Sequence, residues 1–293
     1  MMSLISQYDI SNWAPFVDDS TKQALLADLE KGQVIYLPEL SFTISPADQH
    51  FLNPEYLAAG KKNISYNPAN QTLKGIKQNI PKSKSLEKLM CDFSVKAEQL
   101  MRHLFPHYSN AMRIGRTSFR PAEIHGRQTS FRKDDTLLHV DAFPSMPMKG
   151  ERILRLFSNI NPENKPRQWH LGESFSAVMK RFAPQINSPF PGSHGMMNLF
   201  GITKQKRTLY DHYMLNIHHK MKKDNNYQQN AIQERMDFPA NTTWIVFTDL
   251  VSHAALSGQH LLEQTFYVPA HAQFHPEWAP LKQLEHYLQR SLL

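Results

Sequence analysis

The residues best suited to chemistry in this sequence are a histidine and an aspartate two positions apart. They are His139 and Asp141, in the string TLLHVDAF at 136–143. In a β-strand, residues i and i+2 point to the same face, so a strand here would present both groups together. One imidazole and one carboxylate make up two thirds of a 2-His-1-carboxylate site. Such a site binds Fe(II) and leaves coordination positions open for dioxygen and a co-substrate.

The third ligand of this site must be a histidine from a distant strand. His253, in FTDLVSHAALSG, opens a predicted strand directly after another strand and a turn. His260 is the competing candidate, but it follows Ser-Gly-Gln in a predicted turn, where a solvated histidine is the more common outcome. We therefore predict that His139, Asp141 and His253 bind the metal, and we predict no further acid or base in the chemistry.

A pair of this kind is a weak motif by itself. The chain has 15 histidines, and a His-x-Asp pair is expected roughly 0.7 times by chance in such a chain. The alternative to metal binding is that His139 and Asp141 are a surface pair on an edge strand, without a functional role. A rival pair, His275 and Glu277, has no predicted strand around it, and only His286 follows it. Zinc hydrolysis is a further alternative for the same three ligands, although catalytic zinc sites with one carboxylate often take both histidines from one helix.

The co-substrate expected at such an iron site is 2-oxoglutarate, a dianion whose free carboxylate is best held by an arginine. In ERILRLFSNI, at 151–160, Arg155 shares one face of a predicted strand with Ile153 and Phe157. Burying an arginine among apolar neighbours is costly unless it meets an anion, so Arg155 is the first candidate and a structural salt bridge is its alternative. Three further residues are weaker candidates for the same cavity: Arg120, Thr136 and Trp169.

The strands that must position these residues lie mainly in the second half of the chain. Short predicted strands recur at 33–40, 113–120, 126–131, 136–141, 151–159, 242–249, 253–256 and 261–269. Predicted helices lie at 20–32, where Ser20 opens a capping box, at 85–105, 173–182 and 203–222, and from Pro280 onward. Residues 41–84 are polar and are predicted to form long loops. Regularly spaced short strands favour a sandwich or barrel, so we predict an α+β fold with a mainly β core. No linker is evident, and residues 1–293 are predicted to form one domain.

Composition favours an anionic partner and excludes several other functions. The net charge is +7 with a pI near 9.3, which suits an acidic metabolite, a phosphorylated lipid or a nucleic acid. The single cysteine, Cys91, excludes an internal disulfide. The N-terminus lacks the pattern of a signal peptide and no apolar stretch is long enough to span a membrane, so a cytoplasmic location is expected. Motifs for dinucleotides, phosphate-binding loops, serine hydrolases and helical zinc sites are absent from the sequence.

Three long strings carry a resemblance to a known family. They are LLHVDAFPSMPMKGERILRLFSNINP, RQWHLGESF and TTWIVFTDLVSHAALSGQHLLEQTFYVP, at 137–162, 167–175 and 242–269. They resemble the bacterial Kdo hydroxylases, which are Fe(II)- and 2-oxoglutarate-dependent enzymes acting on 3-deoxy-D-manno-oct-2-ulosonic acid (Kdo) in the lipid A inner core. The resemblance covers at least residues 112–270. It implies a double-stranded β-helix, the jelly roll of cupin-like proteins, with flanking helices.

The resemblance also implies a reaction and a set of residues. His139, Asp141 and His253 match the iron positions, and the enzyme would use Fe(II), 2-oxoglutarate and O2 to hydroxylate C3 of Kdo, giving the 3-hydroxylated sugar Ko with succinate and CO2. Many oxygenases of the wider superfamily place a basic residue shortly after the distal histidine, but LLEQTFYV at 261–268 contains none. The carboxylate must then be held from elsewhere, which again points to Arg155.

The substrate implied by the resemblance is Kdo-lipid A, an anionic glycolipid of lipopolysaccharide, so peripheral contact with the inner membrane is expected. No nucleic acid or obligate protein partner is expected. Candidates for gripping the sugar are Arg116, Arg127 and the segment 147–152, each of which is equally compatible with a solvated surface charge. Two alternatives are the same iron chemistry on a protein or nucleic acid, and a non-enzymatic barrel that binds an anionic sugar.

Overall fold

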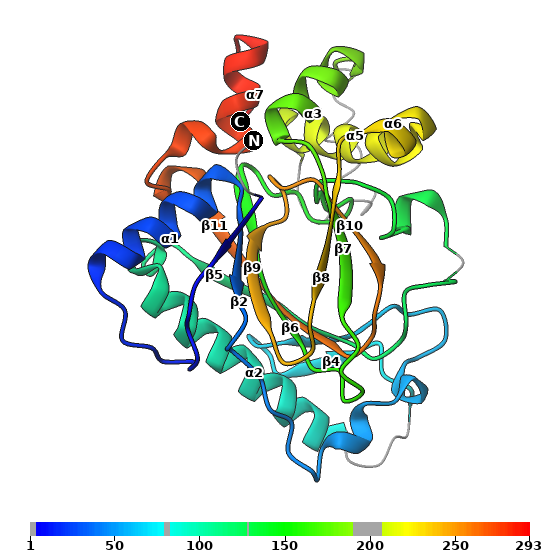
Figure 1. Cartoon of the computed structure of the whole chain (residues 1–293). Helices are drawn as coiled ribbons and strands as arrows, with labels where there is room; N and C mark the ends of the chain where they lie inside the picture. Colours follow the sequence, from blue (N-terminus) through cyan, green and yellow to red (C-terminus); the bar gives the residue numbers. More distant parts are fainter. Residues whose placement is uncertain (1–3, 79–82, 128, 190–206) are drawn as a thin grey trace.

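The inner faces of two β-sheets form the centre of the structure. It is a computed structural model that describes residues 4–78, 83–127, 129–189 and 207–293. In Figure 1, α1 (Asp19–Lys31) and α2 (Ser83–Leu104) lie outside the large sheet, while helices from the second half of the chain gather at one end. These helices are α3 (Phe175–Phe182), α5 (Leu209–Lys223), α6 (Asn225–Asn230) and α7 (Pro280–Leu288).

The large sheet has eight strands in the order β1-β2-β9-β6-β11-β5-β3-β4. All neighbours are antiparallel except β1 and β2. Its centre, β6 and β11, pairs over nine residues and is nearly all buried. The strands are β1 (Ile5–Gln7), β2 (Val34–Leu37), β3 (Ile64–Asn67), β4 (Thr72–Lys74), β5 (Arg113–Arg120), β6 (Glu151–Asn159), β9 (Thr243–Phe247) and β11 (Leu261–Pro269).

The small sheet has the order β10-β7-β8, with β7 (Arg167–Leu171), β8 (Glu234–Phe238) and β10 (His253–Ser257). A bridge between His139 and His253 adds the segment around His139 to its outer edge. Four extended segments therefore face the large sheet. The aromatic side chains of Phe157, Trp169 and Trp244 pack between the two sheets.

The amphipathic helices form where the apolar spacing predicts them. The buried residues of α2 recur at helical spacing from Leu86 to Leu104, and the helix packs on β5, β11 and β3. Gly32 ends α1 in the left-handed conformation, with φ of 92°. The N-cap of α1 is Asp18, so the predicted capping box at Ser20 is wrong. The carboxylate of Asp18 accepts a hydrogen bond from the Thr21 backbone N–H. The helix is therefore capped two residues earlier than the sequence predicts.

The predicted fold class is confirmed: a mixed α+β protein with a large β core and flanking helices. Of the predicted strands, 113–120, 151–159 and 261–269 coincide with β5, β6 and β11. The predicted helix at 203–222 begins outside the described residues, and its described part is α5. The prediction of one domain over 1–293 stays a prediction.

Several elements differ from the prediction. The described part of 126–131 contains no strand, because Gly126 turns the chain with a φ of 77°. The stretch 41–84, predicted as loops, contains β3 and the edge strand β4, which are only four and three residues long. Strands β1, β7 and β8 and helix α6 were not predicted. None of the helices in the described ranges has the length and apolarity needed to cross a bilayer.

Candidate metal centre and anion-binding cavity

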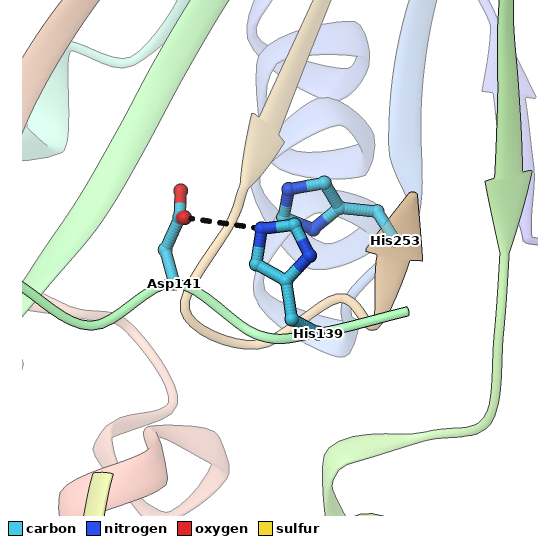
Figure 2. Close-up of side chains that lie close together, drawn as sticks. All are labelled: His139, Asp141 and His253. Carbon is cyan, nitrogen blue, oxygen red and sulfur yellow. Dashed lines mark ion pairs between the residues drawn. The ribbon is translucent and has the colours of Figure 1, made fainter. Parts of the chain in front are cut away.

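Three side chains from two neighbouring segments converge between the sheets. His139 and Asp141 come from the segment after the short helix Phe131–Lys133, and His253 opens β10 (Figure 2). One ligand atom from each lies within 4.8 Å of the others, so the three can hold one metal ion. Asp141 Oδ1 is 3.7 Å from His139 Nε2. The backbone bridge between His139 and His253 fixes the two imidazoles side by side, with ring centroids 4.7 Å apart.

Both imidazoles are held in the orientation that metal binding requires. The Nδ1 of His139 lies 2.7 Å from the Leu137 carbonyl, and the Nδ1 of His253 lies 2.8 Å from the Val251 carbonyl. A carbonyl oxygen can only accept a hydrogen bond, so Nδ1 carries the proton and donates in each ring, and Nε2 keeps its lone pair for a metal. Burial lowers the pKa of both histidines, well below 6.5 for His139, which keeps them neutral in the absence of an ion.

The segment that carries His139 and Asp141 is an extended stretch with one strand, β10, beside it. On one edge, His139 exchanges backbone hydrogen bonds with His253. On the other edge, side chains replace a strand. Gln228 accepts from the Leu138 N–H at 2.8 Å and donates to the Leu138 carbonyl at 3.0 Å, while His218 Nδ1 lies 2.7 Å from the Val140 carbonyl. The predicted strand at 136–141 is therefore reduced to one bridge, yet its alternation still points the side chains of His139 and Asp141 into the site.

The carboxylate of Asp141 is stabilised as an anion. Burial alone would raise its pKa, but Arg155, His253 and His139 together lower it below its usual range. Arg155 Nη2 approaches Asp141 Oδ2 to 3.0 Å without hydrogen-bond alignment, so Oδ2 accepts no hydrogen bond. Arg155 also donates to Glu263 at 3.0 Å. The arginine thus occupies the inward face that the sequence predicts, and it contacts acidic groups there.

A cavity next to the three ligands is lined by three arginines, Arg120, Arg155 and Arg167, and by Trp169. Glu263, 3% exposed, accepts from both Arg120 and Arg155. Glu263 thereby faces two guanidinium groups, while Arg167 has no carboxylate oxygen within 4.0 Å in the described part of the chain. An arginine without a carboxylate partner is a suitable group to bind an incoming carboxylate.

Arg167 is a functional candidate that the sequence analysis missed. It is 3% exposed and donates to the Gly258 carbonyl at 2.7 Å, while Nε has no hydrogen-bond partner among the residues that the structure describes. Burial, followed by repulsion from Arg120, lowers the pKa of Arg167 to about 9. Its signal in the sequence was the alternation RQWHL at 167–171, which places Arg167 on the same face as Trp169. Trp169 itself stacks on His253, and its buried Nε1–H has no acceptor.

The remaining candidates lie elsewhere. The hydroxyl of Thr136 donates to Asp134, and Arg116 donates to Ser65, so neither reaches the cavity in this arrangement. Arg127 donates to the Ala122 and Glu123 carbonyls near the rim.

Arg152, in the basic segment 147–152, is fully buried and paired with Asp249 at 2.7 Å, so it is unavailable to a sugar. His260 lies in the turn before β11, and His275 pairs with Glu277 on the surface.

Comparisons with known proteins agree with this geometry. The family model of the 3-deoxy-D-manno-oct-2-ulosonic acid (Kdo) hydroxylases matches residues 12–291. The chain belongs to the Kdo hydroxylase family. Among curated proteins, no match to the sequence is found.

Solved structures of one Kdo hydroxylase, KdoO, are similar over nearly the whole chain. KdoO is a non-heme Fe(II) alpha-ketoglutarate-dependent dioxygenase, and its complex with alpha-ketoglutarate and Fe(III) shares 47% sequence identity with a TM-score of 0.94. That alignment covers 99% of this chain and 97% of KdoO. The cobalt(II) complex shares 48% identity with a TM-score of 0.95, again over 99% and 97% of the two chains. The family resemblance predicted from the sequence is confirmed.

Proposed function

We propose that this Kdo hydroxylase holds Fe(II) with His139, Asp141 and His253 and holds 2-oxoglutarate with the arginines of the adjacent cavity. The observation that carries the proposal is the convergence of two neutral, oriented imidazoles and one carboxylate beside that cavity. A 2-His-1-carboxylate set with room beside it suits Fe(II) oxygenases. KdoO, at 47% identity, is a dioxygenase of this type and was crystallised with Fe(III) and alpha-ketoglutarate.

Buried polar atoms without partners support the assignment of the cavity to 2-oxoglutarate. They include Asp141 Oδ2, Arg155 Nε, Arg167 Nε and Trp169 Nε1. Such atoms are costly to leave unpaired, and a metal with a bound dicarboxylate would supply an electrophile for the first and acceptors for the others. Arg167 is the best placed of the arginines for the distal carboxylate, because Glu263 and Asp135 already surround Arg120, and Asp141 and Glu263 already contact Arg155.

When bound, iron and 2-oxoglutarate supply the oxidising power that inserts one oxygen atom of O2 into a C–H bond and yields succinate and CO2. The protein's own residues do the rest. His139 and His253 remain neutral donors, Asp141 remains an anion, and Phe157 and Trp169 exclude water from the cavity. Exclusion of water and fixed orientation are the contributions that a protein makes to such a reaction.

The proposed substrate is Kdo linked to lipid A, hydroxylated at C3. A sugar acid and a phosphorylated lipid are both anions, which suits a net charge of +7. We infer peripheral contact with an anionic membrane surface on the same ground. Vesicle sedimentation should then weaken as salt rises, and binding that is indifferent to salt would contradict the electrostatic contact. Family membership gives no support to a protein or nucleic-acid substrate or to a non-enzymatic sugar-binding role.

Substrate-stimulated turnover tests the proposal. The purified chain would be incubated with Fe(II), 2-oxoglutarate and detergent-dispersed Kdo-lipid A under 18O2, with succinate and the glycolipid mass measured together. The expected result is succinate release that depends on the glycolipid, with one 18O atom added to the Kdo residue. Succinate release without change in the glycolipid, or no release at all, would overturn it.

A further inference from the structure

The proposed reaction requires a second anion site close to the metal. The name 3-deoxy-D-manno-oct-2-ulosonic acid places the carboxylate on C1 and the methylene on C3. Two bonds separate these carbons, a distance of roughly 2.5 Å. Any pose that brings C3 to the metal therefore brings the sugar's carboxylate with it. A cation that is not already used for 2-oxoglutarate must receive that charge, since an unpaired carboxylate in a dry cavity is strongly disfavoured.

Lys222 is a buried cation that comes from a different element than those arginines. It lies on α5, one turn after His218, whose ring packs edge-on against His139 with centroids 5.1 Å apart. The arginines of the cavity instead project from β5, β6 and β7. Lys222 is 3% exposed, although lysine side chains are rarely buried without a partner.

The ammonium of Lys222 lacks an ionic partner. Its one hydrogen-bond contact is the Arg132 carbonyl at 3.5 Å, the outer limit for a hydrogen bond. Across the described ranges, no carboxylate oxygen lies within 4.0 Å of it. Burial lowers the pKa of Lys222, while the charges of Asp135 and Asp141 raise it and that of Lys62 lowers it again. An anion beside Nζ would remove this penalty.

The neighbouring carboxylate Asp135 is already engaged by other cations. Lys62 Nζ pairs with Asp135 at 2.9 Å, and Arg120 lies 3.8 Å from the same carboxylate. Lys222 feels the charges of Asp135, Asp141 and Asp134 only at longer range. An anionic group that enters the site could therefore approach Lys222 Nζ more closely than these carboxylates do.

We propose that Lys222 binds the C1 carboxylate of the sugar and thereby directs the adjacent methylene toward the metal. The proposal rests on the function proposed above and names the residue that recognises its substrate. It explains why a lysine is buried on α5 one helical turn after His218, which contacts His139. It also gives the enzyme a means to distinguish a 3-deoxy sugar acid from a neutral sugar.

The test compares Lys222→Met with Lys223→Met, the same change at the exposed neighbouring position on α5. The ligands are Kdo-lipid A with one Kdo unit and its C1 methyl ester, which lacks the charge. Equilibrium binding is measured without oxygen on the protein loaded with Co(II) and 2-oxoglutarate, and turnover is measured with Fe(II). Wild type and Lys223→Met should bind the acid about 10- to 100-fold more tightly than the ester. Lys222→Met should bind both alike and release succinate with less hydroxylated product.

Other outcomes separate the possible failures. A Lys222→Met protein that still prefers the acid, or that loses affinity for acid and ester equally, would overturn the role of Lys222 while leaving the function intact. No hydroxylation by wild type would overturn both. If Lys222→Met does not fold, as judged by circular dichroism and Co(II) titration, Lys222→Arg decides. Retained preference for the acid over the ester supports the proposal, and a lost preference contradicts it.

Discussion

Replacing Gln228 with leucine should loosen the segment that carries two of the three proposed metal ligands. The side-chain amide of Gln228 accepts one hydrogen bond from Leu138 N–H at 2.8 Å and donates to the carbonyls of Leu138 and Met221 at 3.0 and 2.7 Å. Leucine has a similar size but can make none of these bonds. Leu138 is 1% exposed, so its backbone groups would lose their partners with little access to water.

The magnitude follows from the number of unpaired groups. Leaving a buried backbone donor or acceptor unsatisfied costs about 1–3 kcal/mol each. Two such groups on Leu138 predict a loss of roughly 2–6 kcal/mol in the free energy of unfolding. The metal site should suffer as well, because a residue that orients ligands changes metal affinity by about 10- to 100-fold.

Urea unfolding of the metal-free protein measures the first effect, and Co(II) titration measures the second. Gln229→Leu is the matched control, since Gln229 is exposed on the same helix. The control should change the free energy of unfolding by less than about 0.5 kcal/mol. Gln228→Leu could instead lower the free energy of unfolding no more than the control does and bind Co(II) equally well. In that case the side chains of α5 and α6 do not take the place of a second strand beside Leu138.

Three further predictions concern the cavity and the turn before β11. Arg167→Met should raise the KM for 2-oxoglutarate about 10- to 100-fold, because a charge-assisted hydrogen bond is lost; an unchanged KM would remove Arg167 from the co-substrate site. Trp169→Phe should keep the stacking on His253 but lose the Nε1 donor, so the KM should rise about 3- to 10-fold, and no rise would indicate a packing role alone. Burial lowers the pKa of His260 below 6.5, so the unfolded chain binds more protons below that pH and stability falls as the pH drops. Asparagine tolerates the positive φ at this position. His260→Asn should therefore reduce the loss of stability at low pH by at most about 1.4 kcal/mol per pH unit. Urea unfolding at about pH 7.5 and about pH 5.5 measures it, and equal pH dependence in both proteins would contradict the assignment.

The sequence predicts that the proposed ligands His139 and Asp141 lie together, because their spacing is local. His139 and Asp141 share a face through alternation alone, and this holds even though the segment forms a single bridge instead of a regular strand. Arg155 was found for the same reason, since its apolar neighbours on β6 mark an inward face. Residues whose role depends on local alternation and burial cost can be predicted in this way.

Residues whose role depends on tertiary contacts were missed. Gln228 is an ordinary polar residue on a short helix, and nothing in its surroundings predicts a bond to Leu138, 90 positions away. Arg167 was missed because three of the five residues in RQWHL are polar, although this segment forms a strand paired on both sides. Thr136 was chosen for its proximity in sequence to His139, but its hydroxyl is used locally by Asp134. In each case the deciding partner comes from a distant element or from a turn.

The most direct test of the central assignment is the visible charge-transfer band formed when Fe(II) and 2-oxoglutarate are added without oxygen. Wild type should develop the band, His139→Ala should not, and His125→Ala, a change at an exposed histidine, should behave as wild type. This result would establish that the predicted triad binds iron chelated by 2-oxoglutarate. A band of equal strength in His139→Ala, or no band in wild type, would contradict the assignment of the metal site on which the proposed function depends.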